Sequence, residues 1–486
     1  MIKTSFPHLR RAARHYRMLL APLLLFCGSL LFAQEPSQEA FSQPLPIPPL
    51  LTGLRNGSET IYEITAQPGS RRFLKEAETP TLGYNGDYLG PTLRFRRGER
   101  IRMRVYNQLT ETTTVHWHGL EVHGAADGGP HQEIAAGTIW EPRFGVDQPA
   151  ATLWYHPHPM GRTAEQVYLG LAGMIIIDDE VSDSLDLPET YGKNDIPLII
   201  QDRRFQNDGT FSYRLNMPDM MHGLIGATYL VNGEVKPSLS ATGELIRFRL
   251  LNGSNSSIYR LSFDDGSAFS QIASDGGFLE KPVEMSTLIL SPGERGEILL
   301  DLRGKTPGDS LHLVTETFQG YRDAVLKIVV KDEQPGRVPA AEMPSRLVPV
   351  ARIPEARAER SRRFDLETMG SGGRLTINGR KMDMERIDLR VRAGSTEIWE
   401  IANAGAGMMQ IPHSFHVHGV QFQILDINGE PPPEQNRGWK DTVLLWPGDR
   451  MRIIIPFREF PGIYMYHCHL LEHEDDGMMG QFEVYP

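Results

Sequence analysis

Cysteine is nearly absent from this sequence: its 486 residues include only Cys27 and Cys468. Cys27 falls in an N-terminal apolar run that we expect to be removed, which leaves Cys468 alone. A single cysteine cannot form an internal disulfide, so disulfide bridges are excluded as the framework of the fold. A free thiol is prone to oxidation in an oxidising compartment, and a bound metal ion would protect it.

Long hydrophobic runs and positive charge are also scarce. A basic start without acidic residues precedes the apolar run 19–31, and Ala33 is a suitable cleavage point, so we predict a secretion signal at 1–33. The run is too short to span a membrane comfortably, and no later segment is long enough either; an uncleaved membrane anchor is the alternative interpretation of 1–33. We therefore expect a periplasmic or extracellular protein without stable membrane insertion. Removing the five basic residues of the signal takes the formal net charge from −11 to −16, a balance that argues against nucleic acid as a partner.

Glycine and proline are abundant, with 47 and 35 residues, which favours short strands and turns over long helices. One turn–strand–turn pattern recurs three times, with a glycine nine residues before an asparagine. The three units are Gly98 to Asn107, Gly243 to Asn252 and Gly394 to Asn403. Near-equal spacing of about 150 residues indicates internal repetition and predicts an all-β chain of three Greek-key β-sandwich domains.

The repeat sets the expected domain boundaries. We predict a first domain at 34–185, a second at 186–334 and a third at 364–486. The intervening stretch 335–363 is rich in proline, arginine and glutamate and is predicted to be a linker. Its basic residues Arg360, Arg362 and Arg363 are then most simply a solvated connector.

Ten histidines fall in four short clusters, one of which also carries other potential ligands. The clusters are His116-Trp117-His118, His156-Pro157-His158, His413-Ser414-Phe415-His416-Val417-His418, and His467-Cys468-His469 followed by His473 and Met478. On an extended strand, residues i and i+2 point to the same face, so each His-x-His pair aims both imidazoles one way and Cys468 points the other way. The pattern predicts two sites. One holds His413, Cys468, His473 and Met478, and the other holds the remaining eight histidines.

The residue types of the two sites indicate copper. Two histidines, a thiolate and a methionine are the ligands of a blue-copper electron-transfer site, whereas zinc has little use for the thioether. Eight imidazoles are too many for one metal and suit three copper ions with positions open for O2. A single His-x-His pair is more often hydrogen bonded in a core or exposed, but that explanation does not account for all ten histidines. Cys468 is bonded through the chain to His467 and His469, which gives a short electron path.

The motifs resemble those of three-domain bacterial multicopper oxidases, especially the cuprous-oxidase and bacterial-laccase branch. The matching segments are 116–122, 154–158, 413–419 and 467–479. The resemblance implies three cupredoxin domains, of which the second is a spacer without copper ligands. It also implies four copper ions and O2 as the electron acceptor. Type 1 copper would bind His413, Cys468, His473 and Met478, type 2 copper His116 and His416, and the type 3 pair His118, His156, His158, His418, His467 and His469.

Two acidic residues match positions of this family near the cluster, Asp127 and Glu474. Because water formation consumes four protons, a carboxylate beside the cluster is needed as a relay, and we predict catalytic roles for both. Asp127 has an alternative explanation as a turn former before Gly128-Gly129. Asp441 and Asp475 are candidate acceptors for histidine ring N–H groups, but the sequence does not place them.

The electron donor is less well defined. The methionine-rich insertion of cuprous oxidases is missing, since 374–392 holds only Met382 and Met384. Thioethers suit Cu(I), yet methionine also fills core gaps, and this ambiguity applies to two groups. These groups are Met408-Met409 and the set of Met217, Met220, Met221 and His222. We expect a phenol or Cu(I) as the donor, with aromatic amines and other metal ions still open.

Three other functions are compatible with such a fold: a copper nitrite reductase, a copper-sequestering protein, and a non-catalytic interaction protein. The His-Cys-His pairing argues against the first, and the complete O2-binding ligand set argues against the other two. We expect the protein to be a monomer.

Overall fold

The computed structural model describes residues 40–74, 77–316, 322–332, 342–370, 373–403 and 410–486. The secretion signal predicted at 1–33 and the pair Met408-Met409 lie outside these ranges. Strands in six sheets dominate the described residues, so the predicted all-β class is confirmed. Within the described ranges, no helix combines the length and apolar character needed to cross a membrane.

The sheets follow one another in pairs along the chain. In the first pair, one sheet has the order β1(Leu50–Leu51), β5(Thr92–Arg96), β10(Gly173–Asp178), β9(Ala151–Tyr155). The other has the order β2(Leu54–Asn56), β3(Glu59–Arg71), β6(Arg100–Asn107), β7(Ile139–Trp140), with β4(Thr79–Tyr84) on β3 and β8(Arg143–Gly145) on β6. Along β6, Ile101, Met103 and Val105 alternate with less buried residues, so one face of this strand lies in the core.

The second pair of sheets contains no residue of the histidine clusters. Its larger sheet has the order β13(Glu234–Val235), β12(Thr228–Val231), β11(Asp195–Arg203), β15(Leu245–Asn252), β20(Arg295–Asp301), β17(Phe269–Ser274), β18(Gly277–Met285). Its smaller sheet has the order β14(Ser238–Thr242), β22(Arg322–Lys331), β21(Ser310–Glu316), β16(Tyr259–Phe263), β19(Leu288–Leu290). An apolar core fills the space between them. A separate apolar cluster joins this pair to the first, with Trp154 and Met174 packed among residues such as Ile199 and Leu251.

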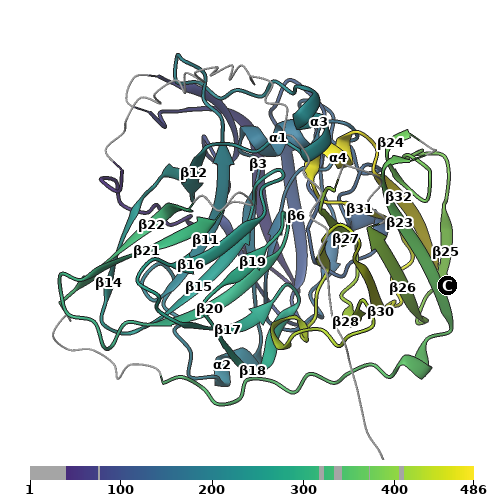
Figure 1. The fold of residues 1–486 in the computed structure, drawn as a ribbon. Helices are drawn as coiled ribbons and strands as arrows, with labels where there is room; N and C mark the ends of the chain where they lie inside the picture. Colours follow the sequence, from purple (N-terminus) through teal and green to yellow (C-terminus); the bar gives the residue numbers. More distant parts are fainter. Residues whose placement is uncertain (1–39, 75–76, 317–321, 333–341, 371–372, 404–409) are drawn as a thin grey trace, which may run out of the picture. The chain divides into compact units, whose positions relative to one another are not determined.

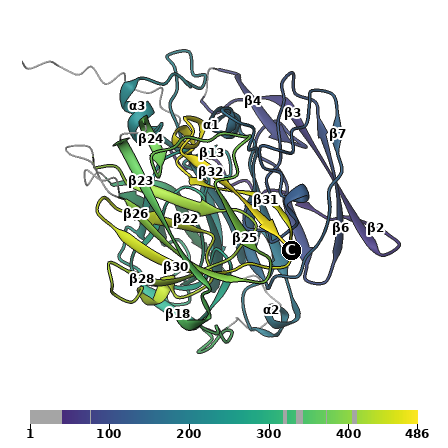
Figure 2. The ribbon, with the colours of Figure 1, turned by 90° about the vertical axis from the view of Figure 1, so that its right-hand side faces the viewer.

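The third pair carries two of the histidine clusters. One sheet has the order β24(Gly373–Ile377), β23(Arg360–Gly370), β26(Thr396–Asn403), β30(Arg450–Pro456), β28(Gln423–Ile427). The other has the order β25(Leu389–Arg392), β32(Met479–Tyr485), β31(Gly462–Cys468), β27(His413–Val417), β29(Thr442–Leu445). Figure 2 shows β31 and β32 side by side near the C-terminus. Strand β23 begins at Arg360, so it takes in the last four residues of the stretch predicted as a linker and places Arg362 in a salt bridge with Glu397.

The three Gly-to-Asn units occupy equivalent places. Each ends in a strand of eight residues, β6, β15 or β26, that pairs in parallel with an earlier strand of its sheet and antiparallel with a later one. The closing asparagine repeats one interaction. The amides of Asn107, Asn252 and Asn403 donate to the carbonyls of Ile134, Leu290 and Leu445, respectively. A polar side chain that satisfies distant carbonyls in this way secures the end of each strand.

The helices among the described residues are short. They are α1(Thr163–Leu169), α2(Glu180–Ser184), α3(Met217–His222), α4(Leu471–Asp475) and the 3-10 turns η1(Gly124–Ala126), η2(Glu355–Arg357) and η3(Glu434–Asn436). Helices α1, α3 and α4 come from the three successive parts of the chain and lie side by side (Figure 1). Because α4 follows directly after the His467-Cys468-His469 motif, this contact brings all three parts of the chain next to that motif.

Candidate metal centre

Backbone pairing joins the histidine clusters two by two. His116 and His156 form an antiparallel bridge, with both N–H groups donating to the opposite carbonyl. On the other side, His416 of β27 lies opposite His467 of β31, and Phe415 lies opposite Cys468. All ten cluster histidines and Cys468 have no exposed surface. Local strand pairing therefore creates two halves, one from the first pair of sheets and one from the third.

The structure brings His413, Cys468 and His473 together. The Cys468 Sγ lies 3.4 Å from His413 Nδ1 and 3.6 Å from His473 Nδ1. The Nε2 atoms of both rings, on the side away from the sulfur, have partners of their own. His473 Nε2 donates to the Met221 carbonyl at 2.9 Å, and His413 Nε2 lies 3.2 Å from Thr368 Oγ1. Both Nδ1 atoms are thereby turned toward the sulfur.

Met478 lies next to this group. It is fully buried in the same apolar cluster as Cys468, and its carbonyl accepts the N–H of Cys468 at 3.0 Å. Its own N–H donates to the His473 carbonyl at 2.9 Å. The backbone thus ties Met478 to Cys468 and His473, two of the three other residues predicted to bind the blue copper.

Burial determines the protonation of this group. It lowers the pKa of His473 to about 4 and the pKa of His413 well below its usual value, so both imidazoles are neutral near pH 7. Burial also raises the pKa of the Cys468 thiol to about 12. Neutral imidazoles are ready to bind a metal, and a metal that binds the sulfur would displace the thiol proton.

The other eight histidines form a second group, which we call the eight-histidine cluster. Rings from the two halves stack on each other: His116 on His418 and His118 on His416, each with 3.7 Å between ring centroids. His467 Nε2 lies 3.1 Å from His418 Nε2 and 3.3 Å from His158 Nε2. The eight rings therefore converge across the boundary between the first and third parts of the chain.

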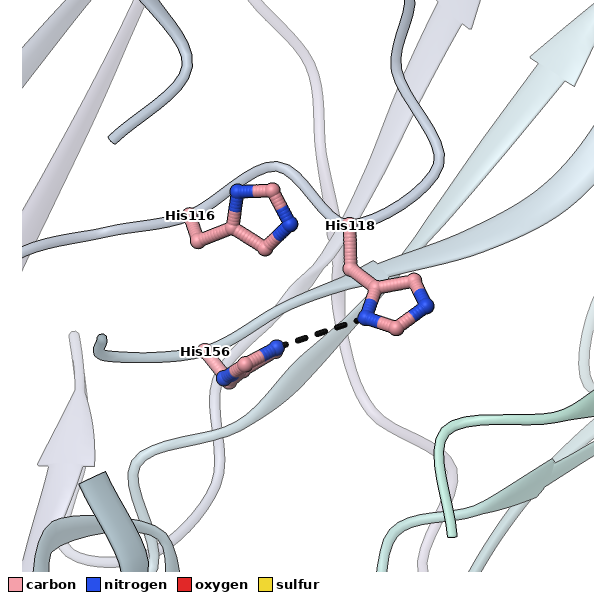
Figure 3. Close-up of side chains that lie close together, drawn as sticks. All are labelled: His116, His118 and His156. Carbon is pink, nitrogen blue, oxygen red and sulfur yellow. Dashed lines mark hydrogen bonds between the residues drawn. The ribbon is translucent and has the colours of Figure 1, made fainter. Parts of the chain in front are cut away.

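The hydrogen bonds of the rings show which nitrogens are free to bind a metal. A carbonyl can only accept, so His156 Nδ1 carries the proton that it donates to the Pro157 carbonyl at 2.8 Å, and its Nε2 presents a lone pair. His118 Nε2 lies 3.1 Å from a carboxylate oxygen of Asp441, which leaves a lone pair on its Nδ1. These two lone pairs face each other at 3.4 Å (Figure 3). Two facing lone pairs repel, whereas a cation between them satisfies both.

The same reasoning applies to other members. His116 Nδ1 donates to the Asp127 carbonyl at 3.0 Å, and His416 Nδ1 donates to the Asp441 carbonyl at 2.8 Å. Their Nε2 atoms, and both ring nitrogens of His469, are buried without a hydrogen-bond partner among the described residues. Buried polar atoms are rarely left unpaired, so these nitrogens fit a metal-binding role.

Asp127 and Glu474 are both buried against the cluster. Asp127 accepts a hydrogen bond from His418 Nδ1 at 2.8 Å, and the same oxygen lies 3.4 Å from His116 Nδ1. The Glu474 carboxylate lies 3.4 Å from His158 Nδ1 and 3.2 Å from His467 Nδ1. Burial by itself would raise the pKa of Glu474. The interactions with His158 and His467 lower it by more than burial raises it, so the net pKa is well below its usual value.

The turn that carries Asp127 is also tightly built. Asp127 ends the 3-10 turn η1, and Gly128 follows with φ of +79°. A Cβ at Gly128 would lie 1.8 Å from the Val115 carbonyl oxygen. Asp127 thus occupies a turn, as the alternative explanation requires, and at the same time directs its carboxylate at two histidines.

The sequence predicted only some of the residues that contact the histidines. Of the two candidate acceptors, Asp441 does contact His118, but Asp475 accepts from the N–H groups of Thr163 and Ala164 at the start of α1 instead. Arg295, on the sheet pair without histidines, was missed although it forms a salt bridge with Asp441. The available signal was weak: Arg295 is a charged residue at the start of β20, but Glu297 and Asp301 in the same strand are charged as well.

The comparisons with known proteins agree with this geometry. Family models described as Multicopper oxidase match residues 65–182 and 356–486. "Multicopper oxidase mco" of Staphylococcus haemolyticus is 42% identical over 425 residues, covering 87% of this chain and 88% of that protein. "Cell division protein FtsP" of Escherichia coli is 37% identical over 459 residues, covering 91% and 93%. The crystal structure of a laccase from Pediococcus acidilactici has a TM-score of 0.83 at 38% identity, covering 91% of this chain and 94% of that one.

These likenesses extend over most of the chain and include both halves of the histidine arrangement. They also confirm the cupredoxin-like fold class that the motifs implied. The chain therefore belongs to the multicopper oxidases, copper-binding oxidoreductases that pass electrons from a donor to O2.

Proposed function

We propose that this protein couples four one-electron oxidations of a small donor to the reduction of O2 to two waters, with consumption of four electrons and four protons. The observation that carries the proposal is the burial of two separate ligand groups linked by one tripeptide. Cys468 faces His413 and His473, while its chain neighbours His467 and His469 belong to the eight-histidine cluster. Electrons have only a few covalent bonds to cross between the two groups.

Four copper ions fit the donor atoms and would supply one-electron redox chemistry at both groups. His413, Cys468, His473 and Met478 would hold the type 1 ion, and His116 and His416 the type 2 ion. His118, His156, His158, His418, His467 and His469 would hold the type 3 pair. In support, the lone pairs of these rings face one another or lack partners among the described residues.

Asp127 and Glu474 would transfer the protons that the reduction of O2 consumes. Each carboxylate is buried and lies within 3.5 Å of histidines from both halves of the cluster. A proton can therefore move between a carboxylate and the site without bulk water in contact with the reacting oxygen. The pKa of Glu474 lies well below its usual value, so the side chain is an ionised carboxylate near pH 7.

A cavity of about 220 Å³ beside α4 is the candidate donor site. Its wall includes Met220, whose neighbour Met221 accepts the hydrogen bond of His473, and Tyr213. Four acidic side chains line it, namely Glu165, Glu472, Asp475 and Asp476, and its single arginine, Arg374, forms a salt bridge with Asp476. This charge favours a neutral phenol or a cation such as Cu(I) over an anionic donor.

The test uses the full-length, copper-loaded protein and the variant Cys468→Ser. We expect the native protein to be intensely blue, to hold four copper ions per chain, and to consume O2 with a methoxyphenol, with Cu(I) or with Fe(II). We expect Cys468→Ser to lose the blue colour and oxidation of every donor. A faster reaction with an anionic sulfonated donor than with a neutral phenol of similar potential would refute the donor-site proposal, and full activity of Cys468→Ser would refute the electron route.

A second candidate is a non-catalytic interaction role. It is favoured by the relatives named Cell division protein FtsP, 37% identical over 91% of this chain. The complete set of buried ligands weighs against it as the main function. If the purified protein binds less than one copper ion per chain under copper excess, the interaction role becomes the better explanation.

Export and a monomeric state are further parts of the proposal. Detection of signal cleavage would test export, and analytical ultracentrifugation would test the monomeric state.

A further inference from the structure

The segment 291–295, which leads into β20, contacts the eight-histidine cluster although its sheet pair contributes no histidine. Gly293 has φ of +85°, and a Cβ there would lie 3.0 Å from Nε2 of His469. Only glycine lets the backbone approach the ring this closely. Because neither ring nitrogen of His469 has a hydrogen-bond partner among the described residues, the ring is held by packing, against this segment and against the rings of His118 and Trp154.

The side chain of Arg295 continues this contact. It is fully buried, and its Nη1 and Nη2 donate to the two carboxylate oxygens of Asp441 at 2.7 and 2.5 Å. Its Nη1 also donates to the Gly293 carbonyl at 2.8 Å, and its Nε donates to the Thr152 carbonyl of β9 at 3.2 Å. A planar guanidinium bound at both oxygens prevents rotation of the carboxylate, which a single ammonium contact would not do.

Asp441 in turn contacts one histidine from each half of the cluster. Its carboxylate oxygen lies 3.1 Å from His118 Nε2, and its main-chain carbonyl accepts from His416 Nδ1 at 2.8 Å. These contacts leave His118 Nδ1 and His416 Nε2 as the metal-binding nitrogens. The glycine after His118 fits this arrangement, because a Cβ at Gly119 would lie 2.8 Å from Nη2 of Arg295.

We propose that Arg295 is a positioning residue of the three-copper site, which acts through Asp441 to orient His118 and His416 together. The inference rests on the proposed function and assigns a role to the sheet pair that carries no ligands. Arg295 contacts three parts of the chain at once: Thr152 in the first, Gly293 in the second and Asp441 in the third. Its loss would leave both halves folded and the blue-copper group intact, but the two halves would no longer share a fixed carboxylate.

The principal test is Arg295→Lys in the full-length, copper-loaded protein. Lysine keeps the buried positive charge but loses the two-point contact. We expect the blue absorption to be unchanged and the electron paramagnetic resonance signal of the type 2 copper to shift or lose intensity. We expect O2 consumption per blue copper to fall about 10- to 100-fold, as for other residues that orient metal ligands.

Arg249→Lys is the matched control. Arg249 is also buried and holds both carboxylate oxygens of Asp195, at 2.7 and 3.0 Å, without contacting a cluster histidine. We expect this variant to lower the melting temperature while it leaves the resonance signal and O2 consumption per blue copper unchanged. Equal losses in both arginine variants would overturn the inference, because they would show a general packing role.

A native resonance signal and a native O2 rate in Arg295→Lys would also overturn it, while the blue, active native protein would still support the proposed function. If Arg295→Lys does not fold, the double variant Arg295→Gln with Asp441→Asn decides. It leaves no buried charge of this pair unpaired, so we expect it to fold and turn blue yet to show the same loss of O2 consumption. A native O2 rate in the double variant would exclude the positioning role.

Discussion

The imidazole of His118 stacks on that of His416, with 3.7 Å between ring centroids and 12° between ring planes. The two residues come from the first and last thirds of the chain, and Asp441 contacts both of them. Stacking of two neutral rings aligns their edges and brings nitrogens from separate sheet pairs to one place. The site is therefore a product of contact between parts of the chain and does not exist within either part.

Replacement of one ring of this stack should separate the two copper functions. We expect His118→Gln to stay blue, because His413, Cys468 and His473 are untouched, and to lose copper from the cluster. O2 consumption should fall by about 100-fold or more, since even residues that only orient ligands contribute 10- to 100-fold. Copper analysis together with anaerobic reduction of the blue band by a phenol measures both effects. A variant with four copper ions and native turnover would contradict the assignment of His118.

Asp127→Asn distinguishes a proton relay from a turn former. Asparagine is as suitable in the turn and can still contact His418, but it does not accept and release a proton near pH 7. We expect a native melting temperature and a native blue band. Reduction of O2 should be roughly 100- to 10,000-fold slower, which is the usual range for loss of a proton-transfer group. A native rate would leave Asp127 with the turn as its only role.

Gly128→Ala tests the geometry of the same turn. The new Cβ would meet the Val115 carbonyl at 1.8 Å, and φ of +79° is unfavourable for alanine. Gly137→Ala is the control, because Gly137 has a similar φ of +75° but no atom within 4 Å of its Cβ position. We expect the control to lose about 1–2 kcal/mol of unfolding free energy from φ alone. Gly128→Ala should lose more and should also show lower O2 consumption, as measured by thermal unfolding and oxygen electrode.

Removal of copper should lower stability without unfolding the protein. The cores of the three sheet pairs are apolar, and of the proposed ligands only Cys468 and Met478 belong to them, so the copper-free protein should keep its β-sheet circular dichroism. Its melting temperature should drop, because a ligand that binds only the folded state stabilises it by about 4 kcal/mol at 1,000 times Kd. Added copper should restore colour and melting temperature together. Loss of sheet structure in the copper-free protein would show that the metals are needed for folding.

The candidate ligand residues could be recognised in the sequence because they occur in short local motifs. Strand geometry alone sorts His467 and His469 from Cys468, and the structure places Cys468 against His413 and His473 as that parity predicts. The all-β class was readable for the same reason, since alternating apolar residues and Gly or Pro turns act over a few residues. The domain boundaries, the export signal and the donor stay predictions.

The neighbours of the ligands were not readable, because they act across the chain. Nothing near Arg295 in the sequence indicates Asp441, and nothing near Asp475 indicates that it caps α1 rather than a histidine. Hydrogen bonds and charge pairs of this kind depend on which surfaces meet when the sheet pairs pack. The sequence by itself thus determined which side chains are candidate copper ligands. Only the tertiary structure decided which nitrogen of each ring is free, because that depends on acceptors brought from distant parts of the chain.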